Sequence, residues 1–328
     1  MESRDLLLMR RTHALVLGLL TALTGGEILA QALPARFEHD RVFLEATAPD
    51  GKPVRLYTDT GGGFNTIATS VAERYSLEPA GQFESDEEKG ELVAFPAFLI
   101  DAGIPRPSQD PWMRGNLVVV PDNALETQGF LGTRWFAERI WQFDYGRKTL
   151  RRLDSFEPTA RYVTLALGFK HDADGKRSLN FPRLTVAIDG QPLEVLLDTG
   201  ATGELTEHSA AVYGLPVGSR VAASYVTELH FKHWQSRHPD WRVVEQAEAV
   251  TGTAFPMIEV PVVDFGGVRV GPVWFSQRPD PIFHQWMSQM MDRQIDGAIG
   301  GSALKYLEIV IDYPNAKVHI APLAPADR

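Results

Sequence analysis

Residues 189–200 read DGQPLEVLLDTG, and residues 50–61 read DGKPVRLYTDTG. In each stretch an Asp-Gly turn leads into an apolar run, and a second aspartate follows the first by nine positions. A tripeptide recurs easily by chance, whereas a turn, an apolar run and Asp-Thr-Gly in one fixed register do not. The repeat therefore indicates a fused duplication with two matched carboxylates, Asp59 and Asp198.

The repeat extends further along the chain. Gly-Phe-Leu-Gly at 129–132 and Gly-Ala-Ile-Gly at 297–300 each precede an apolar segment that ends in Asp-Tyr, with the aspartate 15 positions after the first glycine. These aspartates, Asp144 and Asp312, end apolar strands, so we expect them to cap turns rather than to carry chemistry. Four features thus recur twice in one order, which makes the pattern specific.

This order of motifs resembles the retropepsin and pepsin clan of aspartic proteases, in the form of a fused two-lobe bacterial retropepsin-like aspartyl protease. The resemblance implies an all-β fold with few short helices, in which two retropepsin-like β-barrel lobes form one bilobal pepsin-like chain. Residues 36–154 would form the N-terminal lobe and residues 161–328 the C-terminal lobe. Residues 154–160 break the apolar pattern, and we place the linker there.

The chemistry that two matched Asp-Thr-Gly loops predict is peptide hydrolysis by a water held between carboxylates. One ionised carboxylate takes a proton from the water, and one protonated carboxyl polarises the amide carbonyl. Two carboxylates at close range share a proton and titrate as a pair. The predicted catalytic residues are Asp59 and Asp198, and the sequence does not say which is the acid.

The neighbouring residues predict a support for the dyad. Gly61 and Gly200 permit tight loops whose backbone N–H groups approach the carboxylates. By the resemblance, the hydroxyls of Thr60 and Thr199 hydrogen-bond across the lobe interface, and Thr202 belongs to the same supporting set.

The first copy departs from the second directly after the glycine. It reads Gly62-Gly63 where the second copy has Ala201-Thr202, and Thr58 stands where the second copy has Leu197. Adjacent glycines raise the entropy lost on folding. The alternative function is therefore a catalytically weak or inactive peptide-binding pseudoprotease. A phosphoryl-aspartate enzyme is disfavoured, because neither copy shows Asp-x-Asp-x-Thr or a phosphate-binding Gly loop with Lys.

Composition limits the classes of partner. The chain has 328 residues, 44% of them hydrophobic, which suits about two domains. The formal net charge of −10 disfavours nucleic acid or an anionic membrane surface as a partner, and the absence of cysteine excludes disulfides and a thiol nucleophile. We expect a peptide or protein substrate, no cofactor, no stable membrane partner, and a monomer that forms an intramolecular pseudo-dimer.

Alternating apolar runs and turn residues predict the elements around the motifs. The predicted strands are 42–47, 54–57, 117–120, 184–188, 193–197, 258–263 and 268–275. A Ser-x-x-Glu capping box at Ser70 predicts a helix toward Leu77, and a second helix is predicted at 207–213. Residues 84–89 predict an exposed hairpin tip at the place of the first-lobe flap.

The two copies differ in length. From the catalytic aspartate to the Gly-apolar-apolar-Gly segment is 70 residues in the first copy and 99 in the second. We predict an insertion at about 224–255 that contributes to the substrate cleft. It is rich in histidine and tryptophan: His230, His233, Trp234, His238 and Trp241. No cysteine or carboxylate pattern completes a metal site with these histidines, so no metal is predicted.

The N-terminus predicts a secretory leader. Arg10-Arg11 precedes an apolar stretch from Ala14 to Leu23, and Ala30-Gln31-Ala32 supplies a small-residue cleavage site. We therefore predict a signal peptide at residues 1–32 and a periplasmic or extracellular protein. The alternative is a membrane anchor formed by the uncleaved segment, although its apolar run is shorter than the roughly 20 residues that a spanning helix needs.

Overall fold

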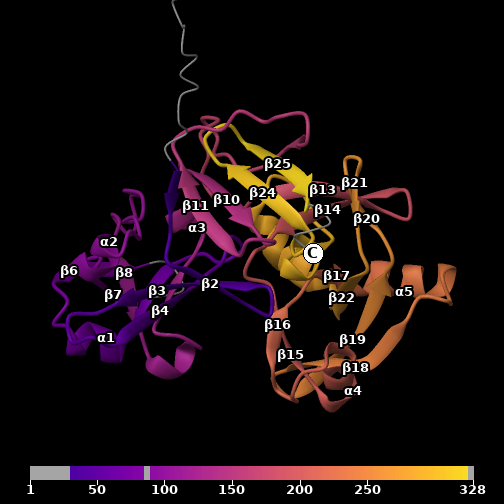
Figure 1. The fold of residues 1–328 in the computed structure, drawn as a ribbon, viewed down its shortest axis with the longest axis horizontal. Coiled ribbons are helices and arrows are strands. Elements are labelled where there is room, and N and C mark those ends of the chain that lie inside the picture. Colours follow the sequence, from indigo (N-terminus) through magenta and orange to yellow (C-terminus); the bar gives the residue numbers. More distant parts are fainter. Residues whose placement is uncertain (1–29, 85–88, 324–328) are drawn as a thin grey trace, which may run out of the picture.

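The protein is described by a computed structural model that covers residues 30–84 and 89–323. Strand residues far outnumber those in the few short helices, so the chain has an all-β fold of several sheets (Figure 1). Within the described residues there are three sheets, one built by each half of the chain and one shared between the halves.

The first half of the chain and the shared sheet have the following strands, each named next to its hydrogen-bonded neighbour. The eight-stranded sheet of the first half contains β2 (Ala35–Glu38), β3 (Arg41–Thr47), β4 (Pro53–Thr58), β9 (Gly129–Leu131), β5 (Asn65–Ala68), β8 (Leu117–Val120), β7 (Lys89–Val93) and β6 (Pro79–Glu84). The shared six-stranded sheet contains β1 (Ala30–Ala32), β11 (Thr149–Leu153), β10 (Ile140–Asp144), β24 (Leu307–Asp312), β25 (Lys317–Pro322) and β12 (Val163–Ala166).

The sheet of the second half has eleven strands. They are β16 (Arg220–Ala222), β15 (Thr202–Leu205), β18 (Val243–Val250), β19 (Thr253–Val260), β22 (Val273–Arg278), β17 (Tyr225–Thr227), β23 (Gly297–Ile299), β14 (Gln191–Leu197), β13 (Arg183–Ile188), β20 (Val263–Phe265) and β21 (Val268–Val270). The helical segments are α1 (Thr69–Arg74), α2 (Ala97–Asp101), η1 (Asp122–Ala124), α3 (Thr133–Phe136), α4 (Glu207–Tyr213), α5 (Glu228–Arg237), η2 (Ile282–Trp286), η3 (Met287–Met290) and α6 (Gly301–Leu304).

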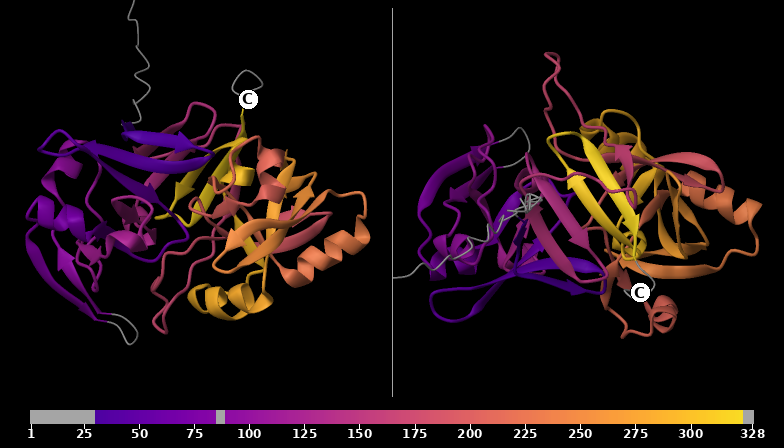
Figure 2. Two further views of the ribbon diagram at one scale, coloured as in Figure 1. Left: turned by 90° about the horizontal axis from the view of Figure 1, so that it is seen from below. Right: turned by 45° about the horizontal axis from the view of Figure 1, so that its top comes forward.

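The strand pairing repeats between the two halves. β4 runs parallel to β9, which pairs antiparallel with β5, and β14 runs parallel to β23, which pairs antiparallel with β17. The shared sheet has matching strands on its two sides, because β10 pairs with β24 at its centre and each continues into the next strand of its own half. The sequence duplication is thus a structural duplication, and the two half-sheets lie on either side of the shared sheet (Figure 2).

A dense aromatic core lies beside the shared sheet. Trp135 and Trp141 stack with ring centroids 4.3 Å apart, and Phe136 and Tyr313 are also fully buried. Large aromatic side chains contribute much of the apolar area that folding removes from water. This core joins strands from both halves, because Trp141 lies on β10 and Tyr313 directly follows β24.

Most predicted elements are confirmed, with several corrections. Within the described residues no sheet closes into a barrel; strands β10, β11, β24 and β25, which the prediction assigned to separate lobes, instead form the shared sheet. The predicted strand 258–263 is interrupted at Pro261, and the predicted strand 268–275 is interrupted at Gly271-Pro272. Proline lacks the N–H that a strand interior needs. The predicted linker at 154–160 lies between β11 and β12 and contains no strand or helix.

The predicted capping box is wrong. Helix α1 begins at Thr69 and has no side-chain cap, and the hydroxyl of Ser70 donates to Asp122 instead, with an O–O distance of 2.5 Å. The helix at Glu207–Tyr213 is confirmed and has the capping box that α1 lacks, formed by Thr206 and Ser209.

The predicted place of the second-copy insertion is also wrong, as the strand register shows. Thr66 pairs with Phe130, and Tyr225 pairs with Ala298 in the matching place, but Thr66 follows Asp59 by 7 residues whereas Tyr225 follows Asp198 by 27. Most of the surplus is therefore the segment β15–α4–β16, and residues 224–255 correspond to ordinary elements of the first copy. A smaller surplus of about ten residues lies between β22 and β23 and includes η2 and η3.

The predicted N-terminal leader lies mostly outside the described residues. Its last three residues, Ala30–Ala32, form β1 at the edge of the shared sheet, paired with Arg151–Leu153. Among the described residues, no helix combines the length and apolarity that a membrane crossing requires.

Candidate active site

The two predicted aspartates occupy matching positions at the ends of central strands. Asp59 follows β4, and its N–H donates to the carbonyl of Leu131 on β9 at 3.0 Å. Asp198 follows β14, and its N–H donates to the carbonyl of Ile299 on β23 at 2.8 Å. Each aspartate is therefore held in place by the strand that runs parallel to its own. This pairing fixes where each carboxylate lies relative to its sheet.

The Asp-Thr-Gly loops contact each other so closely that their glycines cannot be replaced without movement. A Cβ at Gly61 would lie 2.5 Å from Cγ of Asp198, and a Cβ at Gly200 would lie 2.1 Å from Cγ of Asp59. The structure thus brings Asp59 and Asp198 together, and their carboxyl groups are hydrogen-bonded to each other. The loop N–H groups of Gly61 and Gly200 also donate to Asp59 and Asp198, at 2.6 and 2.9 Å.

The environment of the two carboxyls favours one shared proton. Burial raises the pKa of both Asp59 and Asp198. The nearby charge of Asp59 raises the pKa of Asp198 further, well above its ordinary value, while hydrogen bonds from Gly200 and Ala201 oppose this rise. Two carboxyl groups this close cannot both be ionised without a large cost in free energy. The pair therefore retains a proton that an isolated carboxyl would have lost.

The threonines of the two loops hydrogen-bond crosswise. The hydroxyl of Thr60 donates to the carbonyl of Leu197 at 2.7 Å and accepts from the N–H of Thr199 at 2.9 Å. The hydroxyl of Thr199 accepts from the N–H of Thr60 at 3.2 Å. Both threonines are fully buried, so each loop satisfies polar backbone groups of the other.

Replacing Thr60 with valine should lower the free energy of unfolding by about 1–3 kcal/mol, because Leu197 O and Thr199 N would become buried without partners. Thr66→Val is the matched control, since the buried hydroxyl of Thr66 has no hydrogen-bond partner within the described residues. We expect the control to change stability by less than about 0.5 kcal/mol. Urea denaturation of both variants measures the difference, and equal losses would contradict the crosswise role.

Sequence reasoning missed Tyr57 as part of the site. Its hydroxyl, buried at the loop junction, donates to the carbonyl of Gly200 at 2.8 Å and lies 2.7 Å from the hydroxyl of Thr202. The guanidinium of Arg41 lies over the Tyr57 ring, 4.6 Å from its centroid. A tyrosine two residues before Asp59, where the second copy has Leu196, was the available signal. Because leucine cannot make such hydrogen bonds, the contacts that hold the two Asp-Thr-Gly loops together differ between the copies.

Of the two adjacent glycines, Gly62 and Gly63, only the first is required for steric reasons. A Cβ at Gly62 would lie 2.2 Å from the Phe130 ring and 3.2 Å from an oxygen of Asp59, whereas a Cβ at Gly63 would meet nothing closer than Phe181 at 3.9 Å. Phe130 stands where the second copy has Ala298. Gly62 is therefore explained by the larger side chain on its own neighbouring strand.

Gly62→Ala should destabilise the protein by about 1–3 kcal/mol, because either the Phe130 ring or the Asp59 loop must move. Gly63→Ala should be neutral or stabilising by up to about 1 kcal/mol, since the unfolded chain loses conformational freedom without strain in the fold. Thermal unfolding of the two variants compares neighbouring glycines directly. A Gly63→Ala variant that is the less stable of the two would contradict this assignment.

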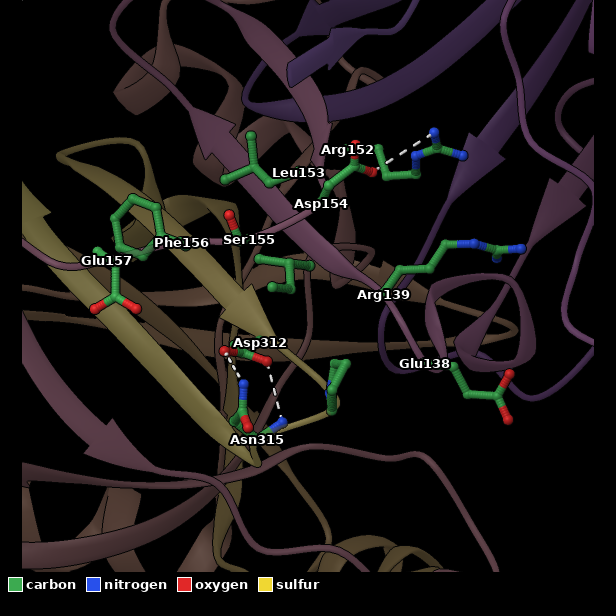
Figure 3. A pocket seen from close by; sticks show the side chains of 12 residues that line it. Glu138, Arg139, Arg152, Leu153, Asp154, Ser155, Phe156, Glu157, Asp312 and Asn315 are labelled. Atoms are coloured by element: carbon green, nitrogen blue, oxygen red, sulfur yellow. Dashed lines mark hydrogen bonds and ion pairs between the residues drawn. The ribbon is translucent and has the colours of Figure 1, made fainter. Parts of the chain in front are cut away.

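The aspartates that end the repeat have structural roles. Asp144 accepts from the N–H of Arg147 at 2.9 Å, and Asp312 accepts from the N–H and side-chain amide of Asn315 at 3.0 and 2.8 Å. Asp312 lines a polar cavity of about 510 Å³ beside Arg139 (Figure 3). None of that cavity's lining residues belongs to the Asp-Thr-Gly loops, and the predicted turn roles of both aspartates are confirmed.

Some residues of the region predicted as an insertion lie in the core, and others line cavities. On α5, Trp234 is buried against Phe275, and beyond the helix Trp241 stacks on His238 with ring centroids 4.2 Å apart. Tyr225 and Glu248 instead line cavities next to the dyad loops. Among residues 30–84 and 89–323, no three His, Cys, Asp or Glu side chains form a group that could hold a metal ion.

Comparison with models of known protein families gave no match, and comparison with curated proteins found no significantly similar sequence.

Proposed function

We propose that this protein is an aspartic endopeptidase of the retropepsin and pepsin type, secreted to the periplasm or the cell exterior. The observation that carries the proposal is the hydrogen-bonded pair of carboxyls from two matched Asp-Thr-Gly loops. Paired carboxyls that share one proton can supply an acid and a base to the same reaction. The crosswise threonine contacts support it, because they hold the two loops in one fixed arrangement.

The proposed reaction begins with a water molecule between the two carboxyls. The ionised carboxyl of the pair removes a proton from the water, which attacks the peptide carbonyl. The other carboxyl keeps the shared proton, because burial raises the pKa of both members of the pair, and donates a hydrogen bond to the carbonyl oxygen. Collapse of the tetrahedral intermediate transfers a proton to the leaving amine and separates the two product peptides.

A mixed peptide library, incubated with the purified protein and analysed by mass spectrometry, tests this proposal. We expect internal cleavages that a statine-type inhibitor abolishes and that a chelator leaves unchanged. Absence of cleavage together with tight inhibitor binding would favour the inactive peptide-binding alternative. Cleavage that persists in saturating inhibitor would overturn the assignment to an aspartic mechanism.

A further inference from the structure

One cavity adjoins Gly61 and Asp198, a second is lined by Tyr57 and Thr202 near the loop junction, and the duplication makes the two comparable position by position. Tyr57 and Phe130 pair across β4 and β9 beside the first cavity, and Leu196 and Ala298 pair across β14 and β23 beside the second. Two aromatic rings thus stand on one side where a leucine and an alanine stand on the other. The two cavities have similar volumes, about 470 and 430 Å³, so the sides differ in the side chains that line them rather than in space.

The cavity on the second side is apolar and adjoins the catalytic loops. It has a volume of about 430 Å³, and Gly61, Gly63 and Asp198 lie at its edge. Apart from Arg278, which lines both cavities, its remaining wall is mainly aromatic and aliphatic: Phe64, Phe181, Leu196, Tyr225, Phe283, Trp286 and the methionines 287 and 290. Sites of this size with apolar walls and few polar groups are typical of ligand pockets.

One wall of this cavity is formed by the surplus segment between β22 and β23, which the first copy lacks. The segment comprises the π-helical turn η2 and the 3₁₀ turn η3, and π-helical turns often occur at functional sites. Phe283 and Met287 are buried, whereas Trp286 is 63% exposed at the rim of the cavity. An exposed tryptophan beside an apolar cavity provides a surface that a bound side chain can cover.

Polar contacts fix this segment to the strand behind the dyad. Nε2 of His284 lies 2.9 Å from Oδ1 of Asp296, the residue that precedes β23. The hydroxyl of Ser288 donates to the carbonyl of Phe283 at 2.6 Å and accepts from the N–H of Ile295 at 2.9 Å. The wall is therefore held in place before any ligand arrives, which lowers the entropic cost of binding.

The cavity on the first side has a mixed lining that is more polar than the lining of the second cavity. Its lining includes Arg41, Glu248 and Arg278, three charged side chains that are almost fully buried. The guanidinium of Arg278 pairs with Glu248 and lies over the Tyr225 ring at 4.0 Å from its centroid. A large apolar side chain placed there would separate buried charges from their polar surroundings, at a cost in free energy.

We infer that the enzyme selects peptides with a bulky apolar side chain on only one side of the scissile bond, bound in the cavity between Asp198 and Trp286. This inference rests on the proposed function and specifies its substrate class. Leu196 and Ala298 supply an aliphatic wall, and Trp286 and Met290 on the surplus segment enclose the side chain. On the other side of the bond, small or polar side chains are accepted.

Trp286→Ala tests this inference with peptides that carry phenylalanine or alanine at the single flanking position. We expect the preference for phenylalanine, measured as the ratio of kcat/KM values, to fall at least about tenfold, mainly through KM. Trp112→Ala is the matched control, because Trp112 is 52% exposed and lines neither cavity. An unchanged preference in Trp286→Ala, or an equal change in both variants, would overturn the inference.

A second variant and a second readout separate this inference from the proposed function. Ala298→Phe combined with Ala201→Gly fills the cavity with the Phe130–Gly62 arrangement of the first copy, and it should also reduce the preference for phenylalanine. Binding of non-cleavable reduced-amide peptides, measured by calorimetry, needs no turnover. Phenylalanine-selective binding that Trp286→Ala weakens would support the cavity even if no peptide were cleaved. Cleavage without such selectivity would support the proposed protease function but contradict the proposed role of the cavity.

Discussion

Asp59→Asn and Asp198→Asn should each reduce peptide cleavage by about 10²–10⁴-fold, the range that loss of a general acid or base produces. An asparagine cannot remove a proton from water and cannot share a proton with the remaining carboxylate. The two substitutions should act similarly because the structure places both carboxyls in one hydrogen-bonded pair. Steady-state kinetics on one peptide measures the loss, and normal turnover in either variant would contradict the mechanism.

The same variants should remain folded. Because burial raises the pKa of Asp198 above its unfolded value, ionisation of the pair costs stability as the pH rises through the folded pKa. Asp198→Asn removes that cost, so its Tm at neutral pH should equal or exceed that of the wild type. Asp312→Asn is the matched control for activity: its amide oxygen still accepts from Asn315, and cleavage should persist.

Cleavage should be fastest in acid and should fall by about tenfold per pH unit once the pair loses its last proton. Both pKa shifts are upward from the ordinary value of 3.8, with burial as the first cause, so this loss occurs at a higher pH than for an isolated aspartate. The acid limb of the profile should mark protonation of the carboxylate that acts as base. These two limbs belong to the pair rather than to either residue.

The pH dependence of kcat/KM between pH 2 and pH 9 measures both limbs, with far-UV circular dichroism at each pH to show that the protein stays folded. A rate that rises continuously to pH 9 would indicate a different nucleophile. Asp144→Asn provides a control profile, since Asp144 caps a turn and is outside the pair.

The sequence predicted which loops meet at the centre of the candidate site because the determinants of those loops are local. Asp-Thr-Gly, the preceding strand and the following glycine-flanked segment each occupy a short stretch, and each occurs twice. Tyr57 and Arg41 escaped prediction because their roles depend on contacts with the other copy or with a distant strand. Tyr57, for example, donates to Gly200, and no local pattern encodes a contact across 143 positions.

The sequence shows that the second copy is longer than the first, but it does not show where the additional residues lie. A difference in spacing says only that residues are added somewhere between two motifs, and the tryptophans of 224–255 drew attention to the wrong part. The strand register locates the additional residues, because Thr66 pairs with Phe130 in the first copy as Tyr225 pairs with Ala298 in the second. Closed barrels failed as a prediction for a related reason: whether β10 pairs within its own half or with β24 is a long-range choice.

The shared sheet has a consequence for how the chain is made. On β10, Asp144 pairs with Glu308 of β24, a residue that is synthesised 164 positions later. Until β24 emerges, one side of β10 presents unpaired N–H and C=O groups, and exposed strand edges of this kind promote aggregation. The first half of the chain therefore gains its full strand pairing only when nearly the whole protein has been synthesised, and this edge of β10 stays open to wrong pairing until then.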